Sequence, residues 1–277
     1  MINNFYNSKI SQLKKSGVKN PELDLKLIIT KSSNKKFYIL NELNLKDINF
    51  NKFNSYFKRR VKGEPISKIF NKKEFWSLNF FVNNNVLDPR PETEFIVETV
   101  INHYKNNKKK LAICDIGTGS GCLIISLLKQ YKNSIGVGID ISNQAIRIAE
   151  KNAIKHKVND RLDLIFDDWK NLSGKFDVIV SNPPYIKTLD YNNLPSEVRN
   201  FDPKVSLLGG NTGFEKFIEI SSIINLLMKK ESIFVLEIGD KQSEFLIEKF
   251  KNKSLCIIEI IRDYNGIKRV LVFKKMA

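Results

Sequence analysis

The sequence is poor in several features that mark particular classes of protein. It has two histidines and three cysteines among 277 residues, and the cysteines (Cys114, Cys122 and Cys256) show neither a zinc-binding spacing nor an even-numbered disulfide framework. No apolar run approaches the roughly 20 residues that cross a bilayer, and the N-terminus lacks the apolar core of a signal peptide. We therefore expect a cytoplasmic protein that has no metal site and no membrane segment.

Acidic residues are also scarce relative to basic ones. The chain has 30 aspartates and glutamates against 46 lysines and arginines, a formal net charge of +16. A basic protein is drawn to the phosphate backbone of nucleic acids. The lysines are, however, dispersed along the whole chain together with many asparagines and isoleucines, which is typical of an AT-rich genome. The charge is compatible with a nucleic-acid or ribosome-associated partner but identifies neither.

The pattern of apolar residues divides the chain into three parts. Residues 1–64 carry apolar side chains at three- and four-residue spacing, as between Phe53 and Phe57, which predicts a small helical bundle. Residues 65–86 contain short aromatic-rich stretches around polar turns, which predict a hairpin or bridge. Residues 87–277 form the largest part and carry the motifs described below.

From residue 110 onward, short apolar strands alternate with amphipathic helices, which predicts a mostly parallel sheet covered on both faces. The predicted strands are Leu111–Ile116, Ile135–Asp140, Leu162–Phe166, Phe176–Ser181, Ile233–Ile238, Leu255–Arg262 and Arg269–Phe273. The predicted helices are Gly121–Tyr131, Asn143–His156, Phe214–Lys229 and Gln242–Lys251. The turn between the last two strands is too short for a crossover helix, so this pair must be antiparallel. The fold class is α/β and Rossmann-like, preceded by the helical bundle.

A glycine-rich loop ends the first of these strands and opens the first helix. Glycines let the backbone turn tightly and approach a ligand, as in other nucleotide-binding strand-to-helix turns. No Lys-Ser or Lys-Thr pair follows the glycines, so the loop is not a phosphate-binding P-loop. We predict that a cofactor is bound by the residues of this loop: Asp115, Gly117, Thr118, Gly119, Ser120 and Gly121.

Acidic residues also follow the next two strands. Asp140 ends the second strand, where ribose hydroxyls need an acceptor. Asp168 and Trp169 lie just beyond the third strand, where a carboxylate can accept from an adenine amino group and an indole ring can cover the base. Asp115 is placed to hold the amino group of a methionine moiety. The loop alone leaves a nicotinamide cofactor open, whereas the next motif favours S-adenosylmethionine.

The sequence Asn-Pro-Pro-Tyr at residues 182–185 follows the fourth strand. Consecutive prolines fix φ and remove backbone donors, so the Asn182 amide oxygen and the Pro183 carbonyl form two rigidly aimed acceptors. Such a pair suits the two hydrogens of a planar –NH2 group, whose lone pair is then aimed at a methyl donor. We predict that Asn182, Pro183, Pro184 and Tyr185 form the catalytic and substrate-binding loop, with Tyr185 against the flat group and Asn182 also near the cofactor.

With these motifs the chain resembles the HemK-type (PrmC) release factor glutamine methyltransferases over nearly its whole length. A more specific stretch, Pro-Arg-Pro-Glu-Thr-Glu at residues 89–94, is similar to the segment that enters the catalytic domain of that family. The resemblance implies a class I methyltransferase fold for residues 87–277 and S-adenosylmethionine as cofactor. It implies that the loop at Asn182 holds the glutamine of a release factor's Gly-Gly-Gln motif, while residues 1–64 dock that factor. We assign Arg90 and Glu92 to substrate binding and expect a monomer.

Three positions depart from the family pattern. Asp202 stands where glutamate is expected, Lys170 follows Trp169 where an aromatic residue is commoner, and residues 209–213 are only loosely similar. The residues alone do not separate a glutamine amide from an adenine or guanine amino group, because all are planar –NH2 targets. A ribosomal-protein glutamine methyltransferase, a nucleic-acid base methyltransferase and a non-catalytic S-adenosylmethionine-binding assembly factor are therefore alternatives. The lack of an added target-recognition domain disfavours the base methyltransferase, and the intact loop disfavours the assembly factor.

Overall fold

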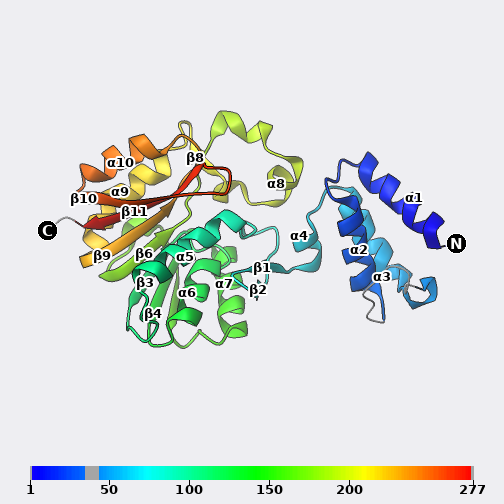
Figure 1. Ribbon diagram of the computed structural model, residues 1–277, viewed down its shortest axis with the longest axis horizontal. Helices are drawn as coiled ribbons and strands as arrows, with labels where there is room; N and C mark the ends of the chain where they lie inside the picture. Colours follow the sequence, from blue (N-terminus) through cyan, green and yellow to red (C-terminus); the bar gives the residue numbers. More distant parts are fainter. Residues whose placement is uncertain (1, 35–43, 276–277) are drawn as a thin grey trace. The chain divides into compact units, whose positions relative to one another are not determined.

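The computed structural model describes residues 2–34 and 44–275, which fall into two compact units (Figure 1). The first unit comprises residues 1–71 and 195–201, and the second comprises residues 72–194 and 202–277. The boundaries predicted after residues 64 and 86 lie on either side of the break that follows residue 71. Among the described residues, no helix has both the length and the apolar character needed to cross a membrane.

The first unit is helical. Its helices are α1 (Ile2–Lys15), α2 (Pro21–Ser32), η2 (Leu45–Asp47), α3 (Phe50–Val61), α4 (Ile66–Phe70) and α8 (Ser196–Phe201). Leu13, Leu25 and Phe53 are completely buried in its core. Asn49 begins α3, because its side-chain oxygen accepts a hydrogen bond from the backbone N–H of Lys52.

The short helix α8 belongs to this unit although it lies far along the sequence. Arg60 of α3 is buried, and its guanidinium pairs with Asp24 of α2 and with Glu197 of α8, each at 2.6 Å. A buried guanidinium depends on such partners, because an uncompensated charge in a protein interior is strongly destabilising. The chain therefore passes between the two units three times, after residues 71, 194 and 201.

The second unit is an α/β domain built on a seven-stranded sheet. Its strands are β3 (Ala112–Ile116), β4 (Ile135–Asp140), β5 (Leu162–Phe166), β6 (Phe176–Ser181), β9 (Met228–Glu237), β10 (Leu255–Arg262) and β11 (Lys268–Lys275), in the order β10-β11-β9-β6-β3-β4-β5. The five strands β9, β6, β3, β4 and β5 run parallel to one another. In contrast, β11 is antiparallel to both of its neighbours, β9 and β10. The predicted parallel sheet with an antiparallel terminal hairpin is confirmed.

Helices and smaller elements complete this unit. They are β1 (Lys73–Phe75), β2 (Leu78–Phe80), η3 (Pro91–Thr93), α5 (Glu94–His103), α6 (Cys122–Gln130), α7 (Asn143–Lys155), η4 (Trp169–Asn171), β7 (Ile186–Lys187), η5 (Thr188–Asn193), η6 (Lys204–Ser206), β8 (Leu208–Gly210), α9 (Glu215–Leu227) and α10 (Ser243–Lys251). The helix predicted to reach Lys229 ends at Leu227, because Met228 is extended and pairs with Phe176 of β6. Helix α5 is missed by the sequence pattern, since its β-branched residues favour strands.

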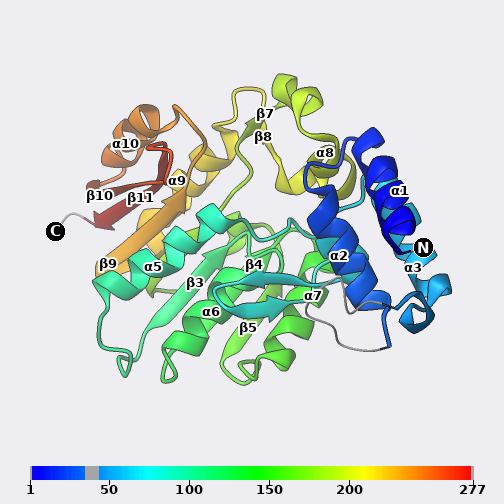
Figure 2. The same cartoon turned by 45° about the vertical axis from the view of Figure 1, so that its right-hand side comes forward.

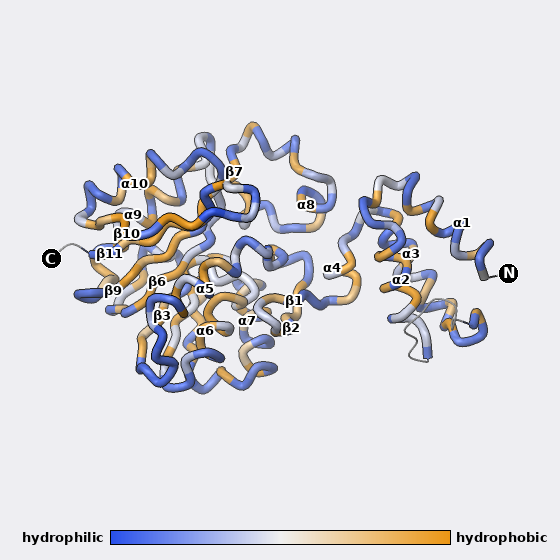
Figure 3. The backbone as a smooth tube through the Cα atoms, viewed as in Figure 1, coloured by the Kyte–Doolittle hydropathy of each residue, from blue (hydrophilic) through white to orange (hydrophobic). Residues whose placement is uncertain are grey.

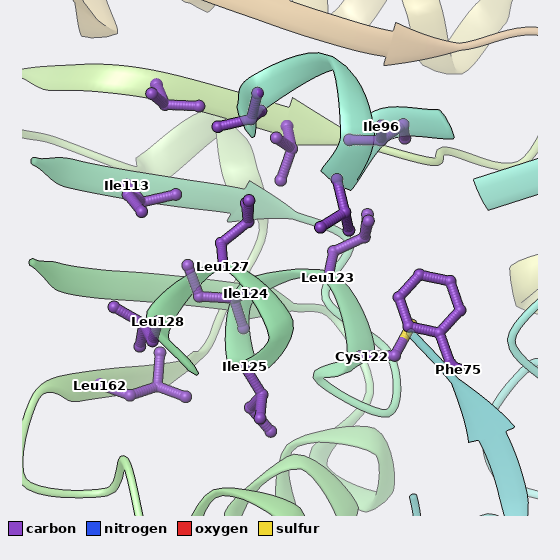
Figure 4. Close-up of a cluster of buried hydrophobic side chains, with 14 of the residues drawn as sticks. Phe75, Ile96, Ile113, Cys122, Leu123, Ile124, Ile125, Leu127, Leu128 and Leu162 are labelled. Atoms are coloured by element: carbon purple, nitrogen blue, oxygen red, sulfur yellow. The ribbon is translucent and has the colours of Figure 1, made fainter. Parts of the chain in front are cut away.

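Side chains from the two faces of the sheet form two separate cores. In β6, Val178 and Val180 point to one face and Ile179 to the other, as the two-residue period of a strand requires. Helices α5, α6 and α7 cover the first face and α9 and α10 the second (Figure 2). Figure 3 shows hydrophobic residues along the central strands, as expected of parallel strands that are buried on both faces. In Figure 4, Phe75 of β1 packs beside Cys122 at the start of α6.

One buried amide connects the β1–β2 segment to the glycine-rich loop. Asn152 of α7 is completely buried, and its oxygen accepts a hydrogen bond from the N–H of Phe81 at 2.7 Å. Its –NH2 group donates to the carbonyl of Phe81 at 3.0 Å and to that of Ser120 at 2.9 Å. Asn152 therefore fixes two loops that are distant in sequence.

Replacing Asn152 with alanine should lower the free energy of unfolding by about 2–4 kcal/mol. The substitution leaves backbone groups of Phe81 and Ser120 without a partner, and each unsatisfied buried group costs about 1–3 kcal/mol. Urea denaturation measures the change. Glu150→Ala, at an exposed position of the same helix, is the control and should change the free energy by less than about 0.5 kcal/mol. A loss below about 1 kcal/mol for Asn152→Ala would contradict the anchoring role.

Candidate active site

The candidate site lies where four parallel strands end. The carboxyl ends of β3, β4, β5 and β6 meet at one edge of the sheet because the strands run in the same direction. From β3 the chain continues to β4 and β5 on one side and then returns to β6 on the other. Ligands bind α/β sheets at such reversals of strand order, and a pocket is present here.

The pocket brings together about half of the residues predicted from sequence. The predicted residues that line it are Gly117, Gly119, Asp140, Asp168, Trp169, Asn182 and Pro184. The predicted residues that lie outside its lining are Arg90, Glu92, Asp115, Thr118, Ser120, Gly121, Pro183 and Tyr185. Residues without a predicted role complete the wall: Asn85, Val86, Leu87, Ile141, Ser142, Ala145, Pro203, Val205, Ser206, Lys216 and Glu219. Most of these are ordinary apolar or small residues, which no motif distinguishes.

The glycine-rich loop depends on glycine at two positions for different reasons. Gly117 has a φ of 76°, and a Cβ atom there would lie 3.9 Å from the Trp169 ring, on the side of the pocket. Gly121 has a φ of 78°, and a Cβ atom there would lie 2.9 Å from Ile125 Cδ1 and 3.2 Å from Ala149 Cβ. At Gly117 the left-handed backbone alone therefore favours glycine, whereas at Gly121 the missing Cβ atom also allows α6 and α7 to pack closely.

Asp140 connects this loop to the end of β4. Its Oδ2 accepts a hydrogen bond from the N–H of Gly119 and its Oδ1 accepts one from the N–H of Ser142, each at 2.9 Å. A carboxylate has about four acceptor sites, two on each oxygen. Each oxygen of Asp140 therefore has one site left, so that the two together could accept from two neighbouring hydroxyls. Burial raises the pKa of Asp140 above its ordinary value, although the two backbone hydrogen bonds oppose this.

Asp115 lies behind the loop rather than in the wall of the pocket. The hydroxyl of Thr118 donates to Asp115 Oδ2 at 2.8 Å, and both side chains are buried. Burial raises the pKa of Asp115 to about 7, in opposition to the hydrogen bond from Thr118. The carboxyl group therefore supports the shape of the loop, and its predicted contact with a methionine amino group stays a prediction.

The segment after β5 forms a second wall. Trp169 is buried, and Lys216 of α9 places its Nζ 5.6 Å from the centre of the indole ring. Asp168 begins η4, because its Oδ1 accepts a hydrogen bond from the N–H of Lys170 at 2.9 Å. The pair thus offers an aromatic surface and a partly exposed carboxylate at the same end of the pocket.

Asn182 is held by two residues to which the sequence motifs assign no role. Its Nδ2 donates to the hydroxyl of Thr93 at 3.0 Å, and this hydroxyl donates to Glu237 Oε2 at 2.7 Å. Thr93 and Glu237 are both buried. Burial raises the pKa of Glu237 to about 7, while the hydrogen bond from Thr93 acts in the opposite direction. The available signals were the position of Thr93 within the Pro-Arg-Pro-Glu-Thr-Glu stretch and an acidic residue near the end of the otherwise apolar run from Ile233 to Ile238.

Tyr185, the last residue of the Asn-Pro-Pro-Tyr loop, packs inward. The Tyr185 ring lies against the backbone of Gly239, where a Cβ atom would be 3.0 Å from its Cδ2. Burial raises the pKa of this tyrosine well above its ordinary value. Tyr185 therefore anchors the loop to the core on the α9 face, and its predicted contact with the substrate stays a prediction.

Asp202, where glutamate was expected, forms an ion pair with Arg90. Arg90 Nη2 pairs with Asp202 Oδ2 at 2.5 Å, and Asp202 Oδ1 accepts a hydrogen bond from the N–H of Asp88 at 3.3 Å. These bonds connect the stretch that contains Leu87 to the stretch that contains Pro203, and both stretches line the pocket. The aspartate at position 202 thus has a structural role although glutamate was expected there.

Comparison with known proteins agrees with this geometry. A family model described as a methyltransferase domain matches residues 107–271, more than half of the chain, so this part of the chain is a methyltransferase domain. The release factor glutamine methyltransferase of Agrobacterium fabrum is 33% identical, over 95% of this chain and 94% of that protein. The bifunctional methyltransferase of Rickettsia bellii is also 33% identical over 98% of this chain, which spans 54% of the length of that protein. The chain belongs to the family of release factor glutamine methyltransferases, as its motifs indicated.

Solved structures confirm the fold. The hMettl16 catalytic domain in complex with MAT2A 3'UTR hairpin 6 superposes with a TM-score of 0.57 at 16% identity, covering 85% of this chain and 87% of that one. The ribosomal protein L11 methylase from Lactobacillus delbrueckii subsp. bulgaricus superposes with a TM-score of 0.51 at 20% identity, covering 69% and 83%. At such identities the likeness extends to the fold alone.

The close packing at Gly121 can be separated from the cost of its backbone conformation. Gly266 has a φ of 79°, and a Cβ atom there would meet nothing within 4 Å. Gly266→Ala should therefore cost only the left-handed conformation, about 1–2 kcal/mol, whereas Gly121→Ala should cost about 1–3 kcal/mol more because of overpacking. Urea denaturation of both variants measures the difference. Equal losses would show that α6 and α7 do not require the close approach.

Proposed function

We propose that this chain transfers a methyl group from S-adenosylmethionine to the side-chain amide nitrogen of a glutamine. The glutamine is that of the Gly-Gly-Gln motif in peptide chain release factors. The observation that carries the proposal is the position of Asn182, which lines the same pocket as Gly117 and Asp140 while its own amide nitrogen is held by Thr93. Relatives at 33% identity over most of the chain are named release factor glutamine methyltransferases.

The pocket suits S-adenosylmethionine. Asp140 retains an acceptor site on each carboxylate oxygen, which matches the two hydroxyls of a ribose. Gly117 and Gly119 allow close approach of the backbone, and Trp169 with Asp168 provides a surface and an acceptor for adenine. When bound, S-adenosylmethionine supplies a methyl group on a positively charged sulfur. Four further residues hold the loop in shape behind the ligand: Asp115, Thr118, Ser120 and Gly121.

The Asn-Pro-Pro-Tyr loop would orient the acceptor. An amide nitrogen is a weak nucleophile because its lone pair is delocalised, so positioning and stabilisation of the developing charge carry the reaction. The Asn182 oxygen and the Pro183 carbonyl would each accept one hydrogen of the –NH2 group, and Pro184 would line its approach. Arg90, whose side chain is 36% exposed, and Glu92 would contact the substrate outside the pocket.

We further assign the helical unit to docking of the release factor. The residues that line the pocket all belong to the second unit, so the helical unit is free to bind a separate region of the substrate. Binding energy from such a remote contact positions the reacting group and raises the rate of the chemical step. In this scheme the enzyme works in the cytoplasm as a monomer, where release factors meet the ribosome.

Asp140→Ala should weaken binding of S-adenosylmethionine at least about tenfold. The substitution removes a charged acceptor for the ribose, and a hydrogen bond to a charged group contributes about 1.5–3 kcal/mol. Titration calorimetry measures the affinity. Asp163→Ala, which replaces an exposed acid on β5 away from the pocket, is the matched control and should bind normally. Unchanged affinity in the Asp140 variant would exclude this assignment.

Transfer of labelled methyl groups tests the substrate. We expect label in the Gly-Gly-Gln glutamine of release factors and none in ribosomal proteins, DNA or RNA that are offered in parallel. Asn182→Ala should reduce turnover by about 100-fold or more, as loss of a residue that stabilises the transition state does, while cofactor affinity stays within about twofold. A short peptide that carries only the glutamine loop should be methylated poorly, because it lacks the docking contact. Methylation of duplex DNA with unlabelled release factors would instead favour a base methyltransferase.

A further inference from the structure

The proposed function requires one orientation of the Asn182 side chain. The two ends of an asparagine amide have almost the same size and shape, so packing alone does not decide whether the oxygen or the nitrogen faces the pocket. Only the oxygen can accept a hydrogen from a substrate –NH2 group. If the Asn182 nitrogen faced the pocket instead, its –NH2 group would oppose the –NH2 group of the substrate, and neither could accept a hydrogen bond from the other. The substrate amide would then be held in the wrong position.

We propose that Thr93 and Glu237 are positioning residues that hold the Asn182 amide with its oxygen toward the pocket. The inference rests on the proposed function, because it gives a purpose to the orientation of Asn182. Thr93 is the last residue of η3 and directly precedes α5, and Glu237 is the last residue of β9. Thr93 lies 89 positions from Asn182 and 144 positions from Glu237 in the sequence. Their side chains form a continuous chain of hydrogen bonds, from Asn182 Nδ2 through Thr93 Oγ1 to Glu237 Oε2.

The direction of this chain follows from the chemistry of its last member. An ionised carboxylate only accepts hydrogen bonds, and a threonine hydroxyl has a single proton to donate. When Glu237 is ionised, the Thr93 proton must point toward it, at an oxygen–oxygen distance of 2.7 Å. The Thr93 oxygen is then an acceptor on its other side, so Asn182 must present its –NH2 group to Thr93. The amide oxygen consequently faces away from Thr93.

Protonation of Glu237 would remove this constraint. A neutral carboxyl group can donate a hydrogen bond to the Thr93 oxygen. The Thr93 hydroxyl can then donate its own proton toward Asn182, and this favours an orientation in which the Asn182 amide oxygen faces Thr93. The groups that act on Glu237 are Thr93 and Asn182, which each hydrogen-bond to it, and the charged or titratable groups Glu92 of η3, Tyr185, Cys122 of α6 and Arg269 of β11. Burial raises the pKa of Glu237 to about 7, while Arg269 lowers it. The carboxylate form that fixes the productive orientation is therefore present above about pH 7 and is lost as the pH falls.

Two threonine substitutions test the positioning role. Thr93→Val keeps the shape of the side chain and removes the hydroxyl, so kcat with a release factor should fall about 10- to 100-fold. This is the loss seen in metalloenzymes when a group that only orients an active residue is removed. The KM and the affinity for S-adenosylmethionine should stay within about twofold. Thr93→Ser, which restores the hydroxyl, should recover most of kcat. Thr99→Val is the control: Thr99 is also buried, but within the described part of the chain its hydroxyl bonds to the Phe95 carbonyl of its own helix α5 and not to Asn182, so kcat should not change.

The pH dependence tests the part played by Glu237. In the unmodified enzyme kcat should rise with pH through a pKa near 7. Glu237→Gln cannot ionise, so its kcat should be lower and this step should be missing from the profile. Persistence of the step in the Gln variant would assign it to another group, such as Asp115, whose pKa is also about 7, and would overturn the part assigned to Glu237.

The outcomes separate this inference from the function on which it rests. If Asn182→Ala abolishes turnover while Thr93→Val has a normal kcat, the positioning role is wrong and the proposed function stands. If Asn182→Ala itself retains normal turnover, the proposed function of the loop fails. If Thr93→Ser is as impaired as Thr93→Val, the hydroxyl is not the group that matters and the inference is overturned.

Discussion

Parallel pairing of β3 with both β4 and β6 is the constraint on which the rest of the catalytic unit depends. In register, Ile116 lies beside Ile139 of β4 and Ser181 of β6, so the residues that follow these positions emerge at one level. Gly117, Asp140 and Asn182 meet in one pocket for this reason. A shift of one residue would turn buried side chains to the opposite face of the sheet, and the two cores make such a slip very costly.

The same arrangement of groups supports the pocket twice. Behind the glycine-rich loop, the Thr118 hydroxyl donates to the buried Asp115, and behind the Asn182 loop, the Thr93 hydroxyl donates to the buried Glu237. In both places burial raises the pKa of the acid to about 7, and the threonine hydrogen bond opposes the rise. In a protein with a formal net charge of +16, two buried acids thus support the two loops that line the pocket.

The sequence predicted those features that depend on neighbours along the chain. Alternating apolar runs located the seven main strands, and the glycines together with Asp140, Trp169 and Asn182 located the pocket. What it missed depends on residues that are distant in sequence. The Thr93–Glu237 bond spans 144 positions and the bond of Arg90 to Asp202 spans 112. Neither bond leaves a periodic pattern in the sequence. A single polar residue in an otherwise apolar segment does not indicate its partner, because the partner is brought close only by the fold.

The membership of α8 in the helical unit limits how the chain can be divided. A single cut after residue 71 would separate the buried Arg60 from Glu197, one of its two charged partners. Arg60 would keep Asp24 but lose Glu197, and removing one partner of a buried ion pair is strongly destabilising. The two units are therefore not consecutive segments of the sequence, because the first contains residues from two separate stretches. A fragment that ended at residue 71 would therefore lack one part of the helical unit, residues 195–201, together with the glutamate that pairs with Arg60.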